Sequence, residues 1–521
     1  MIDRKYIAVL AIILIALCGA AGILYATAAG IGVSPDSVTY IGTARNLLNG
    51  AGLTVPQGNG ANVPLTQFPP VYPIVLAVLS LPGLDPFVTA RWLAALLISA
   101  NILMVGSILL YLLPDQLWAA ILGAFMMLLA PLMANTYVMA WSEPLFILLA
   151  ISGLFLLGNH LDAPRWWRLV AASIFIGLAF LTRYAGIAYV AAGGLGILIL
   201  SREKIRKRLM ETIVFWMISV LPLGVVLIRN VLDRGSATNR ELAFHLISRA
   251  RLWEGLTTLT AWMGIPQQVP TWLHVLVLVV LFGLVSAGLI RGIRLSRTVS
   301  SQPGWRSLPG FILLLLLWLP IYGGFLLISI SFIDANTPLD YRILSPMLVG
   351  LLILLLFVPG WLASKSSSPR RWMWATLIAG VLLMAAYARV TLPTLRSYNI
   401  QGIGFSSVAW RNSPLIEAVE GEPDNLIIYS NAPDAIYLLT GRRASSLPRK
   451  FELAVDQANP DFSKEVQEIG QHLLNDQGLI VFLALDGRLS NPSEADLTSL
   501  LPLTVTFQDA EGKIYRMGSG Q

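Results

Sequence analysis

Six ionisable residues stand at places in this sequence where charge is costly. They lie at the ends of long apolar runs, or in a break between two runs, and they are Asp36, Glu143, Arg183, Arg229, Asp340 and Arg342. Charges near membrane depth are rare and usually take part in binding or catalysis. A carboxylate can accept the proton of an attacking nucleophile, and arginines can chelate a departing phosphate. The set therefore predicts transfer of a group from a donor with an anionic leaving group.

Each of these residues also has a purely structural interpretation. Asp36 stands in the first turn of a predicted helix, where the helix dipole favours an acid. Glu143 could simply neutralise Arg183. Asp340 and Arg342 could be ordinary anchors at the lipid headgroups, as Tyr40, Tyr72 and Tyr184 could be members of an aromatic belt. The prediction rests on the set as a whole rather than on any one member.

The composition indicates a chain that lies mostly in lipid. Of its 521 residues, 56% are hydrophobic and 12% are charged, with a mean hydropathy of +0.70, whereas soluble domains are about one quarter charged. Residues 1–394 carry 26 Lys and Arg against 13 Asp and Glu, and residues 395–521 carry 10 against 16. Basic residues beside apolar runs are typical of cytoplasmic loops, so we expect no nucleic-acid partner.

Eleven apolar runs are long enough, or nearly long enough, to cross about 30 Å of hydrocarbon as helices. They are residues 6–29, 87–113, 117–134, 143–158, 168–182, 184–200, 211–230, 271–291, 309–332, 342–363 and 372–392. The break at Thr182-Arg183-Tyr184 divides the stretch 168–200, because a charge inside one long helix would be costly. The fold predicted for residues 1–394 is an all-α, multi-pass membrane domain.

The distribution of Lys and Arg predicts the orientation of these spans. With a cytoplasmic N-terminus, the strongly basic short loops, such as residues 202–208 and 365–371, fall inside. The loops 30–86, 135–142, 231–270 and 333–341 and the C-terminal tail then fall outside, and the charged set lies in this outer layer. The outer arginines Arg234, Arg240, Arg249 and Arg251 break the rule. They form either a solvated helix face or a site for a lipid phosphate.

Two outer segments are predicted to be structured. In the first loop, 30–86, Ser34-Pro35 opens a helix that Asn49-Gly50 closes, and its apolar stripe predicts that it lies in the membrane interface. Residues 395–521 are predicted to form a small soluble α/β domain. Its expected strands are 425–430 and 478–485, its helices 433–440 and 463–474, and its hairpin 503–508 with 513–517.

Several motifs resemble one class of membrane proteins when they are taken together and in order. In the first outer loop they are Pro35-Asp36-Ser-Val-Thr-Tyr40 and Phe68-Pro-Pro-Val-Tyr72. Further along they are Trp141-Ser-Glu143-Pro-Leu145, Leu181-Thr-Arg183-Tyr184, Asp340-Tyr-Arg342 and, in the tail, Ser430-Asn-Ala-Pro433. The chain resembles the GT-C class of membrane glycosyltransferases, near the family-39-like group that includes protein O-mannosyltransferases and lipid A aminoarabinose transferases.

The resemblance implies inverting transfer of a sugar from a polyprenyl-phosphate donor to a lipid, glycan or protein acceptor on the outer face of the cell membrane. It implies that Asp36 is the general base. Together with the charged set described above, it predicts that Arg183, Arg342 and Arg229 hold the phosphate and that Tyr40, Tyr184 and Asp340 take part in substrate binding. Glu143 would take part in catalysis by positioning the acceptor or an arginine, and the tail would cover the outer mouth of the cavity.

The chain departs from this class in its first loop, where many relatives carry a pair of acids. Ser37 and Val38 follow Asp36 here, so a metal held between paired carboxylates is not expected and no cofactor is predicted. Two other functions remain open. One is a transporter or flippase of lipid-linked sugars, which would use the same arginines. The other is an inactive scaffold whose tail binds a partner.

Overall fold

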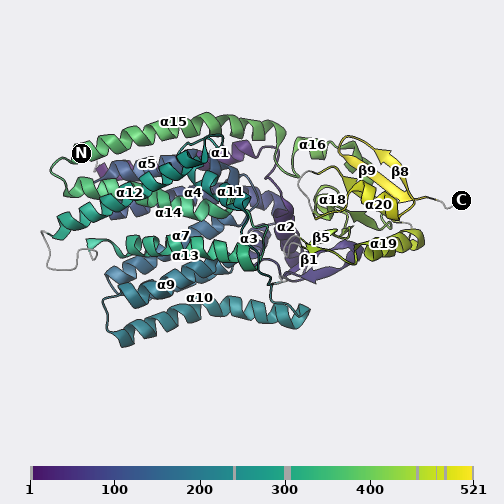
Figure 1. The fold of residues 1–521 in the computed structure, drawn as a ribbon, viewed down its shortest axis with the longest axis horizontal. Coiled ribbons are helices and arrows are strands. Elements are labelled where there is room, and N and C mark those ends of the chain that lie inside the picture. The colour runs from purple at the N-terminus through teal and green to yellow at the C-terminus, as the bar shows by residue number, and fades with distance from the viewer. Residues whose placement is uncertain are drawn as a thin grey trace.

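The computed structural model describes residues 4–238, 242–297, 307–452, 457–476, 478–485 and 490–518. Long helices run side by side along the longest axis and form a bundle, and a smaller region built around a sheet lies at one end of it (Figure 1). The chain begins at the opposite end of the bundle. We call the end of the bundle that faces this smaller region its sheet end.

Eight helices in the described part of the chain are long and apolar enough to cross a membrane. They are α1 (Arg4–Ala26), α4 (Pro86–Leu112), α7 (Glu143–Asp162), α10 (Ile205–Arg234), α12 (Thr271–Arg297), α13 (Gly310–Phe332), α14 (Tyr341–Lys365) and α15 (Pro369–Gln401). Helices α5 (Leu117–Leu129) and α6 (Pro131–Tyr137) make a further span bent by 60°. The predicted multi-pass helical membrane fold is confirmed.

The remaining two predicted spans are short helices. Residues 168–182 correspond to α8 (Trp166–Phe180), and residues 184–200 correspond to the 3-10 turn η2 (Tyr184–Gly186) with α9 (Ile187–Leu200). The predicted break at Arg183 is present, because α8 ends three residues before it. A helix of 15 residues is only about 22 Å long. The last span is longer than predicted, since α15 continues to Gln401, past the boundary expected at residue 394.

The first loop contains α2 (Pro35–Leu48), the strands β1 (Thr54–Pro56) and β2 (Asn62–Pro64), the turn η1 (Gly58–Gly60) and α3 (Val71–Ser80). Helix α2 begins and ends where the sequence predicts. It does not lie free at a membrane surface, however, because both its apolar stripe and its polar face are covered: Ile41 and Ala44 are buried, and so are Tyr40 and Thr43. It lies between the bundle and the sheet region (Figure 1), so protein, where the prediction expected lipid, covers most of its apolar stripe.

The sheet region begins with the short helices α16 (Val408–Arg411) and α17 (Pro414–Glu420). Among its described residues, the main sheet has five strands in the order β4-β3-β7-β9-β8, in which β4, β3 and β7 are parallel, β9 is antiparallel to β7 and β8 is antiparallel to β9. They are β3 (Ile428–Ser430), β4 (Ala444–Ser446), β7 (Leu479–Leu483), β8 (Leu503–Gln508) and β9 (Gly512–Met517). Helices α18 (Pro433–Thr440), α19 (Phe462–Asp476) and α20 (Glu494–Leu500) and the strands β5 (Phe451–Glu452) and β6 (Gln457–Ala458) complete it. The predicted strands, helices and final hairpin are all present.

Three distant segments pair through their backbones just before α2. Gly32 N–H donates to the Val138 carbonyl, and the Gly32 carbonyl accepts from Ala140 N–H, both at 2.8 Å. Phe405 N–H donates to the Val33 carbonyl at 3.0 Å. The entrance to α2 is therefore tied both to the segment before α7 and to the segment after α15. Gly404 makes this approach possible, since it has φ +63° and a Cβ placed on it would lie 2.1 Å from the Val33 carbonyl oxygen.

We expect Gly404→Ala to destabilise the protein much more than Gly441→Ala. Gly441 has a similar φ of +71° but open space around it, so alanine there costs about 1–2 kcal/mol of backbone strain alone. An alanine at residue 404 would suffer the same backbone strain, and its Cβ would also collide with the Val33 carbonyl oxygen. The measurement is the midpoint of thermal unfolding of both purified variants in detergent. Equal decreases for the two variants would contradict the tight approach at Gly404.

Candidate functional site

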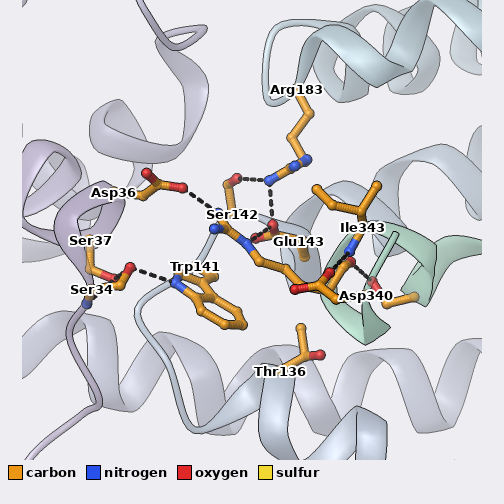
Figure 2. Close-up of polar contacts among 12 residues, drawn as sticks. Ser34, Asp36, Ser37, Thr136, Trp141, Ser142, Glu143, Arg183, Asp340 and Ile343 are labelled. Atoms are coloured by element: carbon orange, nitrogen blue, oxygen red, sulfur yellow. Dashed lines mark hydrogen bonds and ion pairs between the residues drawn. The ribbon is translucent and has the colours of Figure 1, made fainter. Parts of the chain in front are cut away.

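Four of the charged residues meet at the sheet end of the bundle. The Nη2 of Arg342 donates to Oδ2 of Asp36 at 2.6 Å, and its Nε donates to Oε1 of Glu143. The Nη1 of Arg183 donates to the same Glu143 oxygen at 2.5 Å. Figure 2 shows Asp36, Glu143 and Arg183 directed toward one another from three separate parts of the chain. We call these four residues the charge cluster.

Each member of the cluster is placed by the end of a helix. Asp36 is the second residue of α2, Glu143 the first of α7 and Arg342 the second of α14. Arg183 lies in the connection between α8 and α9. Proline at the first or second position helps to start α2 and α7, because its fixed φ suits a first helical turn. Residues far apart in sequence can share one layer because these helix ends lie at the same end of the bundle.

Burial in the cluster is graded. The exposed fraction of the side chain is 1% for Glu143, 17% for Arg342, 19% for Arg183 and 28% for Asp36. A buried carboxylate is tolerated only when it is paired and hydrogen-bonded, and two guanidinium groups supply that for Glu143. The cluster has two positive and two negative members, so the arrangement is close to neutral.

A cavity of about 310 Å3 opens beside the charge cluster. Asp36, Arg183 and Arg342 line it, as do Tyr40 and Tyr184. The other lining residues that carry polar side chains are Gln67, Thr182, Tyr322, Ser329, Asp334, Asn336 and Thr337, and the apolar ones include Phe68 and Phe325. A volume of this size is at the lower end of the range for small-molecule sites. The mixture of arginines, hydroxyls, amides and aromatic rings suits a polar ligand that carries negative charge.

Glu143 does not line this cavity. It lies behind the two arginines, and its second oxygen, Oε2, is buried with no hydrogen-bond partner among the described residues. This placement does not support the prediction that Glu143 is itself a catalytic residue. It agrees with the alternative that Glu143 positions the arginines.

Tyr40 and Tyr184 join the cavity to the surrounding structure. The hydroxyl of Tyr40 lies 3.3 Å from Ser142 Oγ, which also accepts from Arg183 Nη1 at 3.2 Å. Burial raises the pKa of the Tyr40 hydroxyl further above its ordinary value, so this phenol stays neutral and is no candidate for the general base. Tyr184 donates to the Thr66 carbonyl at 3.2 Å, which holds the end of the first loop against the cavity.

Arg229 and Asp340 have other roles in the structure. Arg229 lies in α10, where its Nε is 3.3 Å from Asp233 one turn on, and it does not line the cavity. The structure therefore does not bring Arg229 together with Arg183 and Arg342 at this cavity. Asp340 caps α14 by accepting from Ile343 N–H at 3.0 Å. Burial raises the pKa of its carboxyl, and the Ile343 N–H and the charge of Arg342 act in the opposite direction.

Among the arginines that break the charge rule, Arg249 and Arg251 do not line the cavity either. Arg251 pairs with Glu254 at 2.6 Å and donates to the Asn336 carbonyl, and Arg249 is exposed at the start of α11 (Arg249–Ala261). Arg240 lies outside the described residues. The structure thus favours the interpretation of Arg249 and Arg251 as a partly solvated helix end.

Sequence reasoning missed several residues of the site. Ser142, beside Glu143, contacts both Arg183 and Tyr40, and only its place in the Trp141-Ser142-Glu143 motif pointed to it. Tyr322 lies inside an apolar run, where nothing in the sequence distinguishes it from an ordinary aromatic residue. Asp334 and Asn336 stand in the short loop before α14, where turn residues are expected in any case.

Comparison with known proteins agrees with the fold class that the sequence motifs predict. Residues 69–227 match the family model described as dolichyl-phosphate-mannose-protein mannosyltransferase. This stretch includes Glu143 and Arg183 but neither Asp36 nor Arg342. A comparison with curated protein sequences finds no match.

Several solved structures share the fold across the whole chain. ArnT from Cupriavidus metallidurans, solved with undecaprenyl phosphate, has a TM-score of 0.56 and 13% identity, over 100% of this chain and 99% of that one. An oligosaccharyltransferase from Archaeoglobus fulgidus has a TM-score of 0.55 and 12% identity, over 98% of this chain and 74% of that one. The mycobacterial arabinofuranosyltransferase AftD has a TM-score of 0.51 and 14% identity, over 100% of this chain and 42% of that one. The predicted resemblance to GT-C membrane glycosyltransferases is confirmed at the level of the fold.

Proposed function

We propose that this GT-C-fold protein transfers a sugar from a polyprenyl-phosphate donor to a hydroxyl or amine of an acceptor, with inversion, on the outer face of the membrane. The observation that carries the proposal is the cavity in which Asp36 lies beside Arg183 and Arg342. The family match and the shared fold support a membrane glycosyltransferase in general terms.

Arg183 and Arg342 are the proposed phosphate ligands. Both guanidinium groups border the cavity, and planar guanidinium groups suit phosphate oxygens. In the resting protein Asp36 and Glu143 balance their charge. When the donor phosphate arrives it competes with Asp36 for Arg342, so donor binding itself would release the Asp36 carboxylate toward the acceptor.

An apolar groove suits the polyprenyl chain. It lies between α9 and α10, has a volume of about 590 Å3, and is lined by Ile187, Val190, Ala191, Trp216, Met217, Val220, Leu221 and Gly224. Ile187 follows closely after Ala185, which lines the polar cavity. A phosphate on Arg183 would thus have an apolar surface for its lipid nearby, since burial of a hydrocarbon chain is favourable in proportion to its area.

The proposed reaction has a single displacement step. The acceptor oxygen or nitrogen forms a bond to the anomeric carbon of the sugar while the bond from that carbon to the phosphate oxygen breaks. Asp36 accepts the acceptor's proton. The polyprenyl phosphate leaves with an added negative charge, which Arg183 and Arg342 stabilise.

A metal-independent reaction remains our proposal. Arg342 contacts both Asp36 and Glu143, so a guanidinium group occupies the place between the two carboxylates that a divalent cation would take. The charge needed by a departing phosphate is then available from the protein itself. Equal transfer rates with EDTA and with added Mg²⁺ or Mn²⁺ would support this, and a rate that falls to background in EDTA would contradict it.

The outer location also remains a proposal. The connections 201–204 and 366–368 join helices at the end of the bundle away from the cavity, because α9 and α14 both begin at the sheet end. They overlap the basic stretches 202–208 and 365–371, and such loops usually face the cytoplasm. The cavity at the other end would then face outward.

The test uses the full chain in nanodiscs with radiolabelled polyprenyl-phosphate sugars of long and short lipid chain. We expect Gly224→Phe to raise KM for the long-chain donor about tenfold, equivalent to about 1.4 kcal/mol, and to leave the short-chain donor unchanged. A Cβ on Gly224 meets open space, and Gly224 lines the groove, so a side chain there takes up room that the lipid would use. Gly283→Phe on α12, which also meets open space, is the matched control.

Two results would contradict the proposal. One is the absence of any labelled product, whether lipid, glycan or protein, with every donor tested. The other is an equal effect of Gly224→Phe on both donor lengths, which would exclude the groove as the lipid site. The class of the labelled product identifies the acceptor.

A further inference from the structure

We infer that Trp141 is a positioning residue that holds Arg342 and the helix of Asp36 in one fixed geometry. The inference rests on the proposed function, because its effect is measured on sugar transfer. Trp141 precedes Glu143 by two residues and lies just before α7. It makes two independent contacts, one through its indole N–H with Ser34, just before Asp36, and one through the face of its ring with Arg342 of the charge cluster.

The indole N–H fixes the start of α2. Nε1 of Trp141 donates to Ser34 Oγ at 2.8 Å, and Ser34 is the residue that caps α2. Asp36 follows two residues later, on the first turn (Figure 2). The hydrogen bond therefore helps to fix the orientation of the helical turn that carries Asp36 relative to Trp141, about a hundred residues away in sequence.

The ring of Trp141 supports the guanidinium of Arg342. The Cζ atom of Arg342 lies 4.3 Å from the ring centroid, within the range of cation–π attraction. Trp141 is 8% exposed, and this attraction is stronger where water is excluded. Because Nε and Nη2 of Arg342 are already engaged by Glu143 and Asp36, contact with the ring restrains the guanidinium in the remaining direction.

The backbone makes this arrangement rigid. Residues 138–140 pair with Gly32 through two hydrogen bonds of 2.8 Å, so Trp141 and Ser34 each follow directly from paired segments. A Cβ on Gly32 would lie 2.3 Å from Met139 Sδ and 2.9 Å from the Val138 carbonyl oxygen, and a side chain there would force these segments apart. Trp141 thus has little freedom to compensate if one of its contacts is removed.

Three substitutions separate the two contacts. Trp141→Phe keeps an aromatic face for Arg342 and removes the N–H, Ser34→Ala removes the acceptor and keeps the indole, and Trp141→Leu removes both contacts. Trp118→Phe is the matched control, because Trp118 also donates one indole hydrogen bond of 2.8 Å, to Gln116. Trp118 stands near the start of α5, away from the cavity.

The experiment compares kcat and KM of these variants, per folded protein, in the transfer assay. We expect Trp141→Phe and Ser34→Ala each to lower kcat about tenfold with KM within twofold, and the double variant to be no slower than the single variants, because both remove one shared hydrogen bond. We expect Trp141→Leu to be about a hundredfold slower. Trp118→Phe should match the wild type.

The results can fail in distinguishable ways. If the effects of Trp141→Phe and Ser34→Ala multiply in the double variant, or if Trp141→Leu is no slower than Trp141→Phe, the positioning role is wrong although transfer itself stands. If only the amount of folded protein falls and kcat per folded molecule is unchanged, Trp141 is merely structural. If the wild-type protein transfers no sugar, both the proposed function and this inference are overturned.

Discussion

The Asp36→Asn variant is expected to transfer sugar about 10³-fold more slowly than the wild type, within the range for loss of a general base, while it binds the donor at least as tightly. Asparagine has nearly the same shape but cannot accept the proton of the acceptor. It also competes less well than a carboxylate for Arg342, whose Nη2 lies 2.6 Å from Asp36 Oδ2. Donor binding therefore should not weaken. Single-turnover transfer and equilibrium binding of a polyprenyl-phosphate sugar measure the two quantities separately.

This result separates the proposed enzyme from its rivals. A transporter of lipid-linked sugars would keep most of its flux when Asp36 is changed, and an inactive scaffold would be indifferent even to combined loss of Asp36, Arg183 and Arg342. Asp115→Asn is the matched control, since Asp115 is exposed just after α4, at the end of the bundle away from the cavity. Equal rates for Asp36→Asn and Asp115→Asn would exclude Asp36 as the base.

The Glu143→Gln variant is expected to lose both stability and activity. In the wild type the Glu143 side chain is 1% exposed, and one of its oxygens accepts from both Arg183 and Arg342. Removing the negative partner of a buried pair costs about 3–5 kcal/mol, because it leaves charge uncompensated. Here two guanidinium groups would face each other across a neutral amide. We expect a decrease in the midpoint of thermal unfolding and a loss of transfer, although Glu143 does not line the cavity.

A ligand provides the internal check on this prediction. Polyprenyl phosphate would restore negative charge beside Arg183 and Arg342, so it should raise the unfolding midpoint of Glu143→Gln more than that of the wild type. Asp233→Asn is the control, because Asp233 forms an exposed ion pair with Arg229. The side chains of Arg229 and Asp233 are 34% and 45% exposed, and exposed ion pairs contribute about 0–1 kcal/mol to stability. Equal unfolding midpoints for the two variants would contradict the buried role of Glu143.

The sequence predicts most of the fold because its signals are local. Length and hydropathy identify the spans, Ser34-Pro35 and Asn49-Gly50 delimit α2, and the charge of Arg183 marks the break between α8 and α9. What covers α2 could not be predicted, because an apolar stripe has the same appearance whether lipid or protein covers it. Here Tyr40 and Thr43, on the polar face of α2, are buried as well.

The site could be predicted only as a layer. The sequence predicts that Arg183, Arg229 and Arg342 lie near helix ends on the same side of the membrane. It does not show in which direction each side chain points around the helix axis. Arg229 points to Asp233 instead of the cavity, and Glu143 lies behind the arginines. Trp141 belongs to the Trp141-Ser142-Glu143 motif, but its contacts with Ser34 and Arg342 depend on the folded chain and are not visible in the sequence.

The most direct test of the central claim is an experimental structure of the full chain with polyprenyl phosphate bound in a lipid nanodisc. We expect the phosphate to lie within hydrogen-bonding distance of Arg183 and Arg342, with Asp36 released from Arg342 and the lipid chain in the groove between α9 and α10. A phosphate bound elsewhere, with the contact between Arg342 and Asp36 unchanged, would contradict the account.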